Sequence, residues 1–214
     1  MQLIKTICNW TPKIWFPLAI VLLNGGTNFL AKQYLFAYLD LDLFTISLNF
    51  QIISGFLAIA SALINWILIS VLLFFGCRLL CDSKGVFQNF FKIIGLCHLI
   101  LLVASLGQFI FILIGLPPDL QEPSEVTLEA LASVELPVQR INIAGYICFG
   151  IILISVVQTF FQIRSGQALF ITCISYAIYW ILSKAVGSVF LHVFSFFFGE
   201  FFVPSWQPND PISP

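Results

Sequence analysis

The sequence contains little charge. Of its 214 residues, 9 are lysine or arginine and 10 are aspartate or glutamate, which together make 9% of the chain. A soluble domain carries about a quarter charged residues, so this set is too small to cover a water-exposed surface. The formal net charge of −1 also excludes the clustered basic excess of a nucleic-acid-binding protein. The composition therefore indicates a protein embedded in a lipid bilayer.

Histidine is scarce, and the familiar catalytic motifs are absent. The chain has 2 histidines, His98 and His192, and His98 has no ionisable partner within its apolar stretch. Metal and proton-relay sites in membranes gather several such groups around one cavity. The patterns GxxxxGK[ST], HExxH and GxSxG do not occur either. We expect no catalytic residue, no metal, no cofactor and no enzymatic activity. No pattern in the sequence indicates a small-molecule substrate.

We expect the chain to cross the membrane several times, and the connecting loops that we predict to lie outside the cell contain no cysteine. The 6 cysteines lie near the amino end, beside one inside loop, or within apolar stretches, at Cys8, Cys77, Cys81, Cys97, Cys148 and Cys173. Structural disulfides form in oxidising compartments, so this distribution argues against a disulfide framework. We expect small, buried thiols.

The chain does contain long apolar runs. A helix needs about 20 mainly apolar residues to cross a bilayer core, and such runs cover residues 14–31, 50–76, 93–116, 141–163 and 168–188. They are continuous and lack the alternation of a membrane β-barrel. The predicted fold is all-α, a polytopic membrane bundle of about five transmembrane helices. We expect an amphipathic interfacial segment at 1–13, one membrane domain at 14–203 that ends in a Phe-rich interfacial segment at 189–203, and a tail at 204–214.

The basic residues predict the orientation of the chain. With the amino terminus in the cytoplasm, six basic residues fall inside, namely Lys5, Lys13, Arg78, Lys84, Lys92 and Arg164. Lys32 and Arg140 fall outside. This distribution follows the positive-inside rule and places the carboxyl terminus outside. We expect a multi-pass protein of the inner (plasma) membrane, with a thylakoid or other internal membrane as the alternative.

The only long polar stretch is the second outside loop, residues 117–140. It opens with Pro117-Pro118-Asp119, a helix stop. Its five acids show none of the close, fixed spacing of a calcium loop. We expect a solvated acidic loop that contains a short helix at about residues 128–134.

Polar side chains inside the apolar runs have two interpretations. They are Asn24, Asn28, Asn65, Gln108, Gln158 and Lys184. Amides inside a membrane commonly hold helices together, at about 1 kcal/mol or less per bond. An unwound Asn-Gly-Gly-Thr-Asn segment at 24–28 would instead line a solute path, as broken helices do in transporters. Lys184 lies about one turn from the predicted outer interface, where its side chain would reach the headgroups.

The order of short motifs along the chain resembles a known family. TPKIW at 11–15 leads into the first span, GCR at 76–78 follows the second, KGVFQNFFKIIG at 84–95 opens the third, and RSGQA at 164–168 precedes the last. With five spans and an acidic outside loop, this layout is similar to bacterial members of the Yip family, the Ypt/Rab-interacting membrane proteins. Unlike many members, the chain has no proline soon after Gly95. The resemblance implies a role in membrane organisation and carries no catalytic residues.

Two segments are candidate contact surfaces for lipids or for other membrane proteins. One is the basic and aromatic inside face with Lys84, Phe87, Phe90, Phe91 and Lys92, and the other is the Phe-rich segment with Phe194, Phe198 and Phe201. Large apolar patches of this kind often bind partners. We predict a non-enzymatic scaffold or interaction subunit of a larger membrane assembly. The alternative is a small-solute permease or channel component that uses the intramembrane amides and Lys184.

Overall fold

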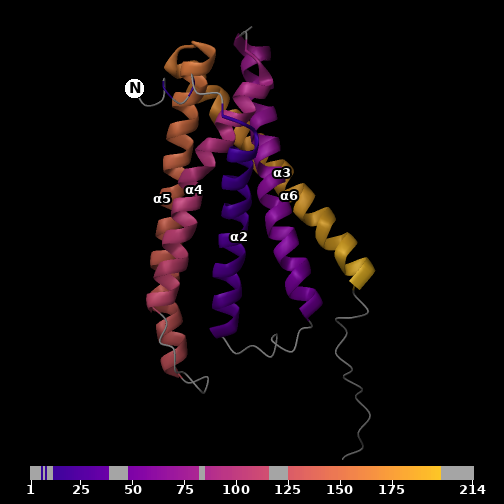
Figure 1. Ribbon diagram of the computed structural model, residues 1–214, viewed down its shortest axis with the longest axis vertical. Helices are drawn as coiled ribbons and strands as arrows, with labels where there is room; N and C mark the ends of the chain where they lie inside the picture. Colours follow the sequence, from indigo (N-terminus) through magenta and orange to yellow (C-terminus); the bar gives the residue numbers. More distant parts are fainter. Residues whose placement is uncertain are drawn as a thin grey trace, which may run out of the picture. The chain divides into compact units, whose positions relative to one another are not determined.

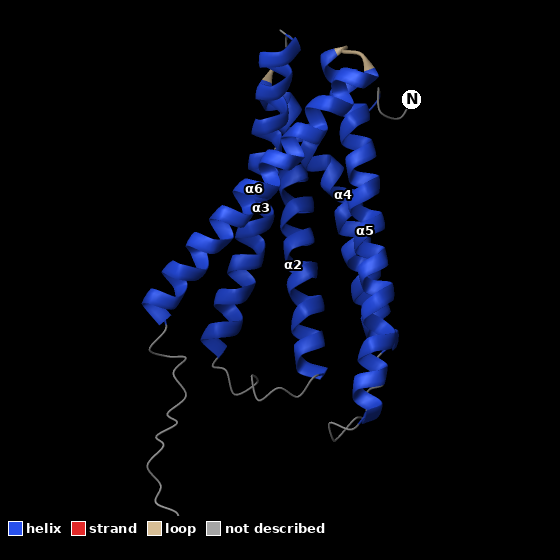
Figure 2. Ribbon diagram, turned by 180° about the vertical axis from the view of Figure 1, so that it is seen from behind, coloured by secondary structure: helices blue, strands red, loops and turns tan. Residues whose placement is uncertain are grey.

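The chain folds into helices. The computed structural model describes residues 6, 8, 12–38, 48–81, 85–115 and 125–198, without the side chains of 35–38, 48–51, 125–132 and 186–198. Five long helices follow one another: α2 (Trp15–Tyr38), α3 (Leu48–Cys81), α4 (Phe87–Gly115), α5 (Glu125–Phe161) and α6 (Ser165–Phe198). The described residues contain no strand (Figure 2). The all-α prediction is confirmed.

Four of these helices are long and apolar enough to cross a membrane. They are α3, α4, α5 from Ser133 and α6 as far as Ala185. The remaining helix, α2, has 24 residues, enough length for a crossing, but its Asn-Gly-Gly-Thr-Asn segment and Lys32-Gln33 make it less apolar. The membrane character predicted from composition is therefore carried mainly by α3 to α6.

The predicted acidic loop is largely helical. The helix α5 begins at Glu125 and runs without a break to Phe161, through Pro137. The expectation of a loop over 117–140 with a separate short helix is therefore wrong from Glu125 onward. Proline removes one backbone donor and crowds the preceding turn, but a neighbouring helix can support such a helix in a membrane. Here Val134 packs with Ile112 of α4, which places this part of α5 against the bundle.

The segment Asn24-Gly-Gly-Thr-Asn28 is helical. The helix α2 continues through it to Tyr38. Side chains bond back to the preceding turn, because Thr27 Oγ1 donates to Leu23 O at 2.8 Å and Asn28 Nδ2 donates to Asn24 O at 3.0 Å. The unwound segment that a transporter-like path would need is not formed.

The chain divides into two compact units, Met1–Ser175 and Tyr176–Pro214. Within the first unit, consecutive helices α2 to α5 alternate in direction, so α2 and α4 run parallel (Figure 1). Short contacts agree with this arrangement. Gly25 of α2 lies against Ile59 of α3, and Gly145 of α5 lies against Ala104 of α4. Within the second unit the described residues are the later turns of α6.

The helix α4 is the centre of the first unit. It packs on α2, α3 and α5, and its buried residues recur along its whole length, from Phe90 to Ile112. Glycines let the backbones approach: a Cβ on Gly145 would lie 2.6 Å from Ala104 Cβ, and one on Gly25 would lie 3.0 Å from Ile59 Cα. Small residues at helix contacts favour association in lipid, where no hydrophobic force drives it.

Candidate functional site: the basic and aromatic end of the first unit

An aromatic cluster closes one end of the first unit. It joins three helices through Phe74 of α3, Phe87 and Phe90 of α4, and Phe160 and Phe161 of α5. The ring centroid of Phe74 lies 5.1 Å from Phe87 and 5.8 Å from Phe161, and that of Phe90 lies 5.2 Å from Phe160 and 5.0 Å from Phe161. Such separations are those of favourable aromatic pairs. The cluster therefore fixes the ends of α3 and α5 and the start of α4.

Gly85, which precedes α4, also lies tightly against this cluster. A Cβ on Gly85 would lie 2.9 Å from Phe160 Cε1 and 3.0 Å from Phe161 Cε1. A residue with a side chain would thus displace both rings. The glycine of the KGVFQNFFKIIG motif is explained by this close approach.

Burial corrects part of the predicted contact face. Phe90 is 0% exposed, so it is a packing residue and cannot touch a partner. Phe91 is half-buried and its ring stacks on Trp66 with centroids 4.1 Å apart. Phe87 is exposed and Lys92 is half-buried, and both remain candidates. Lys84 lies outside the described residues.

Three helices meet most closely around Gly95. A Cβ at this position would lie 2.7 Å from Pro17 Cβ of α2 and 2.8 Å from the Trp66 ring of α3. Trp66 is held in place, because its Nε1 donates to Phe91 O at 2.9 Å. Pro17 belongs to the first turn of α2, where a helix tolerates proline. Sequence reasoning gave Gly95 no role beyond the family resemblance and overlooked Trp66 and Pro17.

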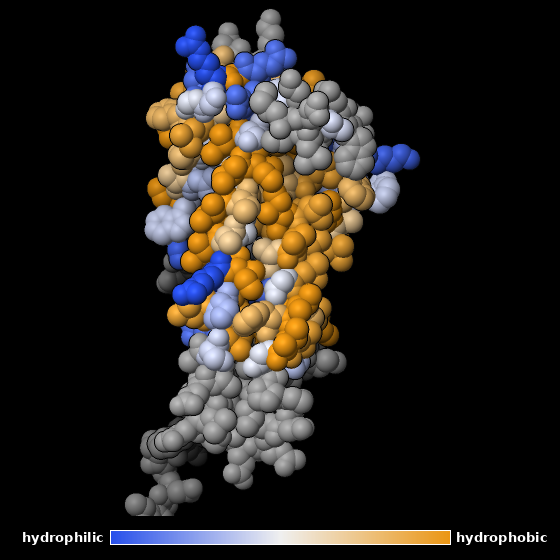
Figure 3. Space-filling view, turned by 90° about the vertical axis from the view of Figure 1, so that its left-hand side faces the viewer, coloured by the Kyte–Doolittle hydropathy of each residue, from blue (hydrophilic) through white to orange (hydrophobic). Residues whose placement is uncertain are grey.

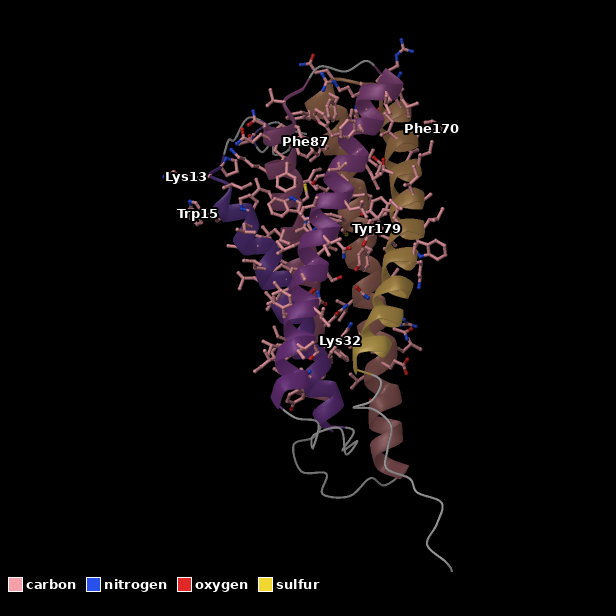
Figure 4. All side chains as sticks on the ribbon, turned by 90° about the vertical axis from the view of Figure 1, so that its right-hand side faces the viewer. Lys13, Trp15, Lys32, Phe87, Phe170 and Tyr179 are labelled. Atoms are coloured by element: carbon pink, nitrogen blue, oxygen red, sulfur yellow. The ribbon has the colours of Figure 1, made fainter. Side chains whose placement is uncertain are left out.

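Four cations belong to the helix ends at this end of the first unit. Lys13 precedes α2, Arg78 lies in the last turn of α3, Lys92 lies early in α4, and Arg164 separates α5 from α6. The Arg78 guanidinium lies 5.9 Å from the centroid of the Phe74 ring, a cation–π distance. Figure 4 shows Lys13, Trp15 and Phe87 toward one end of the helices and Lys32 well away from them. Figure 3 shows hydrophilic side chains at that upper end, above a belt of hydrophobic ones.

The turn between α5 and α6 places Arg164 at this end. Gln162 has a φ of 55°, the left-handed conformation that ends many helices. The amino end of α6 is capped, because Arg164 N donates to Gln167 Oε1 at 3.2 Å and Ala168 N donates to Arg164 O at 3.0 Å. A side-chain acceptor three residues into a helix satisfies a free amide there.

The buried amides of the bundle bind neighbouring helices. Asn24 is 7% exposed, and its Oδ1 accepts a hydrogen bond from Ser105 Oγ of α4 at 2.9 Å and from Asn28 Nδ2 at 3.3 Å. Gln108, also buried, places its Nε2 3.5 Å from Val138 O of α5. These bonds connect α2 to α4 and α4 to α5. Ser105 was not singled out from the sequence, since serine is common in apolar helices.

The other predicted path residues lie elsewhere. Gln158 Nε2 donates to Ser165 Oγ at 3.2 Å across the α5–α6 turn, and Asn65 is half-buried. Lys184 belongs to the second unit and is exposed, with its Nζ 5.9 Å from the Trp180 ring centroid. The described contacts thus support the interpretation in which amides hold helices together.

A double-mutant cycle tests the Asn24–Ser105 bond. We expect the Asn24→Leu and Ser105→Ala substitutions to be coupled by about 0.6 kcal/mol, the average for hydrogen bonds between membrane helices, and by no more than about 1.7 kcal/mol, the maximum. The measurement is reversible unfolding in mixed micelles of the two single variants and the double variant. The pair Thr27→Val and Ser105→Ala is the control, because Thr27 bonds within its own helix. Equal coupling in both cycles would contradict the interhelical bond.

His98 and the cysteines have packing roles. His98 is 3% exposed, its Nδ1 lies 2.9 Å from Ile94 O, and its ring meets Phe149 edge-on at 5.0 Å. Because a carbonyl only accepts, Nδ1 carries the proton. Cys77 and Cys97 are buried as expected, whereas Cys148 and Cys173 are exposed. Burial raises the pKa of the Cys8 thiol, which disfavours the thiolate that binds metals. Within the described residues no three His, Cys, Asp or Glu gather as a metal site.

The Phe-rich segment overlaps the end of α6. The backbone of α6 includes Phe194 and Phe198, and the helix ends ten residues beyond the predicted end of the span at Ser188. The side chains of Phe194 and Phe198, and all of Phe201, lie outside the described residues. The structure therefore extends the helix but does not describe this candidate surface.

The comparisons give no relative. No protein-family model matches the chain, and no curated protein or solved structure is significantly similar to it. The chain is thus characterised by its own residues as a helical protein with four helices apolar enough to cross a membrane.

Proposed function

We propose that this protein is a non-enzymatic, Yip-like integral membrane protein that acts as an interaction subunit for other membrane proteins. The observation that carries the proposal is the exposed apolar surface of α6 within the second unit. Four large side chains there are exposed, namely Ile178, Trp180, Ile181 and Leu182. The unit contains no second helix among its described residues to cover them.

The sequence that follows supports a protein partner over lipid alone. After Lys184 the chain carries seven phenylalanines between Phe190 and Phe202. A single crossing needs about 20 residues, and α6 has 34. The helix is therefore longer than the bilayer requires. Enrichment in aromatic residues is typical of the central part of protein interfaces.

Photo-cross-linking tests this proposal. We expect Ile181→benzoylphenylalanine to give a discrete adduct of higher mass in the native membrane, because the partner covers this face. The control is Ile147→benzoylphenylalanine on α5, since Ile181 and Ile147 are similarly exposed, at 61% and 57%. Purification in mild detergent should retain the same partner. A monomer without adducts at position 181 would contradict the proposal.

A further inference from the structure

Among the residues that the structure describes, the basic end of the first unit has no anionic side chain. Glu135 is the one carboxylate whose side chain belongs to the described residues. It adjoins Val134, which packs on Ile112 near the carboxyl end of α4. The cations Lys13, Lys92 and Arg78 lie at the opposite end, where α4 begins and α3 ends. Asp82 follows α3 but lies outside the described residues.

Two of the cations flank one helix contact. Lys13 precedes Pro17 by four residues, and Lys92 precedes Gly95 by three. Pro17 and Gly95 touch, and α2 and α4 run parallel. Both lysines therefore lie about one helical turn from the same contact, on the side toward the end of the bundle.

Lys92 lies deeper than a residue at a helix end. It follows the first residue of α4, Phe87, by five positions, which is about 7.5 Å along the helix axis. Lys92 as a residue is half-buried, and a lysine this far inside an apolar helix requires a nearby counter-charge or water for its ammonium group. A phosphate at headgroup level, reached by the flexible lysine side chain, meets this requirement.

The surroundings of the lysines are apolar. Trp15 is 61% exposed, Val86 is 61% exposed and Phe16 is 38% exposed. Tryptophan, such as Trp15, is enriched at the headgroup level of a bilayer. An anion bound there therefore lies beside acyl chains, which favours a lipid phosphate over a soluble one.

We propose that Lys13 and Lys92, beside Trp15 at the α2–α4 contact, bind the phosphate of an anionic phospholipid. Arg78 and Arg164, at the same end of the first unit, add positive potential there. Lysines near a charged bilayer surface each contribute about 1 kcal/mol, which corresponds to about a fivefold change in binding. The proposal rests on the membrane function proposed above but not on the protein partner, so cross-linking at position 181 can fail without affecting it.

Lipid selectivity of the full-length protein tests the proposal. The probes are phosphatidylglycerol and phosphatidylcholine, added to the purified protein in neutral detergent, with bound lipid counted by native mass spectrometry. We expect phosphatidylglycerol to be preferred. Lys13→Gln and Lys92→Gln should each weaken this preference about fivefold, and together about 25-fold if the sites are independent.

Control variants distinguish binding at the proposed lipid site from a general effect of positive charge and from misfolding. Lys32→Gln, an exposed lysine of α2 away from this end, should leave the preference unchanged, and Lys92→Arg should retain it. If millimolar inorganic phosphate displaced phosphatidylglycerol, the site would be one for a soluble anion, and the proposal would be overturned. Equal binding of both lipids by the wild-type chain would also overturn it, as would an equal loss in Lys32→Gln.

Discussion

Replacing Phe90 with alanine is expected to give the largest loss of stability in the first unit. Phe90 is 0% exposed and its ring meets Phe74, Phe160 and Phe161. Truncating a buried phenylalanine costs about 3–5 kcal/mol in water-soluble cores, partly through the cavity that remains. In lipid the transfer part of this cost shrinks, because the unfolded side chain stays in an apolar medium. We therefore expect about 3 kcal/mol.

The measurement is unfolding of the Phe90→Ala protein in mixed micelles, with Phe56→Ala as the matched control. Phe56 is 71% exposed, so its removal leaves no cavity, and we expect a change below about 0.5 kcal/mol. Similar effects of the two substitutions would show that the aromatic cluster does not hold α3, α4 and α5 together. A further readout is protease cleavage near Gly85, which should increase only in Phe90→Ala.

Gly95→Ala is expected to be the second most damaging substitution. The new Cβ would lie 2.7 Å from Pro17 Cβ and 2.8 Å from the Trp66 ring. The rigid ring of Pro17 and the hydrogen bond from Trp66 Nε1 to Phe91 O restrict any adjustment. Overpacking of this kind costs about 1–3 kcal/mol, and we expect a value near the upper limit. The same unfolding experiment measures it.

Gly150→Ala is a control for which we expect the opposite change in stability. Gly150 belongs to α5 and an added Cβ would meet nothing within 4 Å. Alanine favours a helix over glycine by about 1 kcal/mol, so this variant should be unchanged or slightly more stable. Equal destabilisation by both substitutions would mean that helix packing at Gly95 is not the cause. The Trp66→Phe and Gly95→Ala double variant should recover part of the loss, because phenylalanine is smaller.

The outcome at Pro137 illustrates what local sequence patterns miss. The prolines at 117 and 118 predict a helix stop, and the acids that follow predict a solvated loop. The structure instead begins α5 at Glu125 and carries it through Pro137. Support for such a helix comes from Ile112 of α4 and Ala31 of α2, which are buried in one cluster with Val134. A neighbouring helix is invisible to reasoning that examines one segment at a time.

The intramembrane amides show the same division. The sequence identifies Asn24 and Gln108 as polar groups in apolar helices. It does not decide whether they hold helices together or line a solute path, because the rotation of each helix is set by packing. The structure brings Asn24 to Ser105 of α4 and Gln108 to the backbone of α5. Because a buried polar group needs a partner, these contacts explain why the amides occur where they do.

The sequence by itself determined the solvent and the fold class, because continuous apolar runs with 9% charged residues can satisfy their backbone only as helices in lipid. It also predicts that most basic residues lie at one end, because successive crossings alternate in direction and the basic residues follow every second crossing. The tertiary structure decided which members of the basic and aromatic segment are buried, as Phe90 is, and which stay accessible, as Phe87 and Lys13 are. The physical reason is that burial depends on the side chains of other helices, which approach α4 only where residues such as Gly95 leave room.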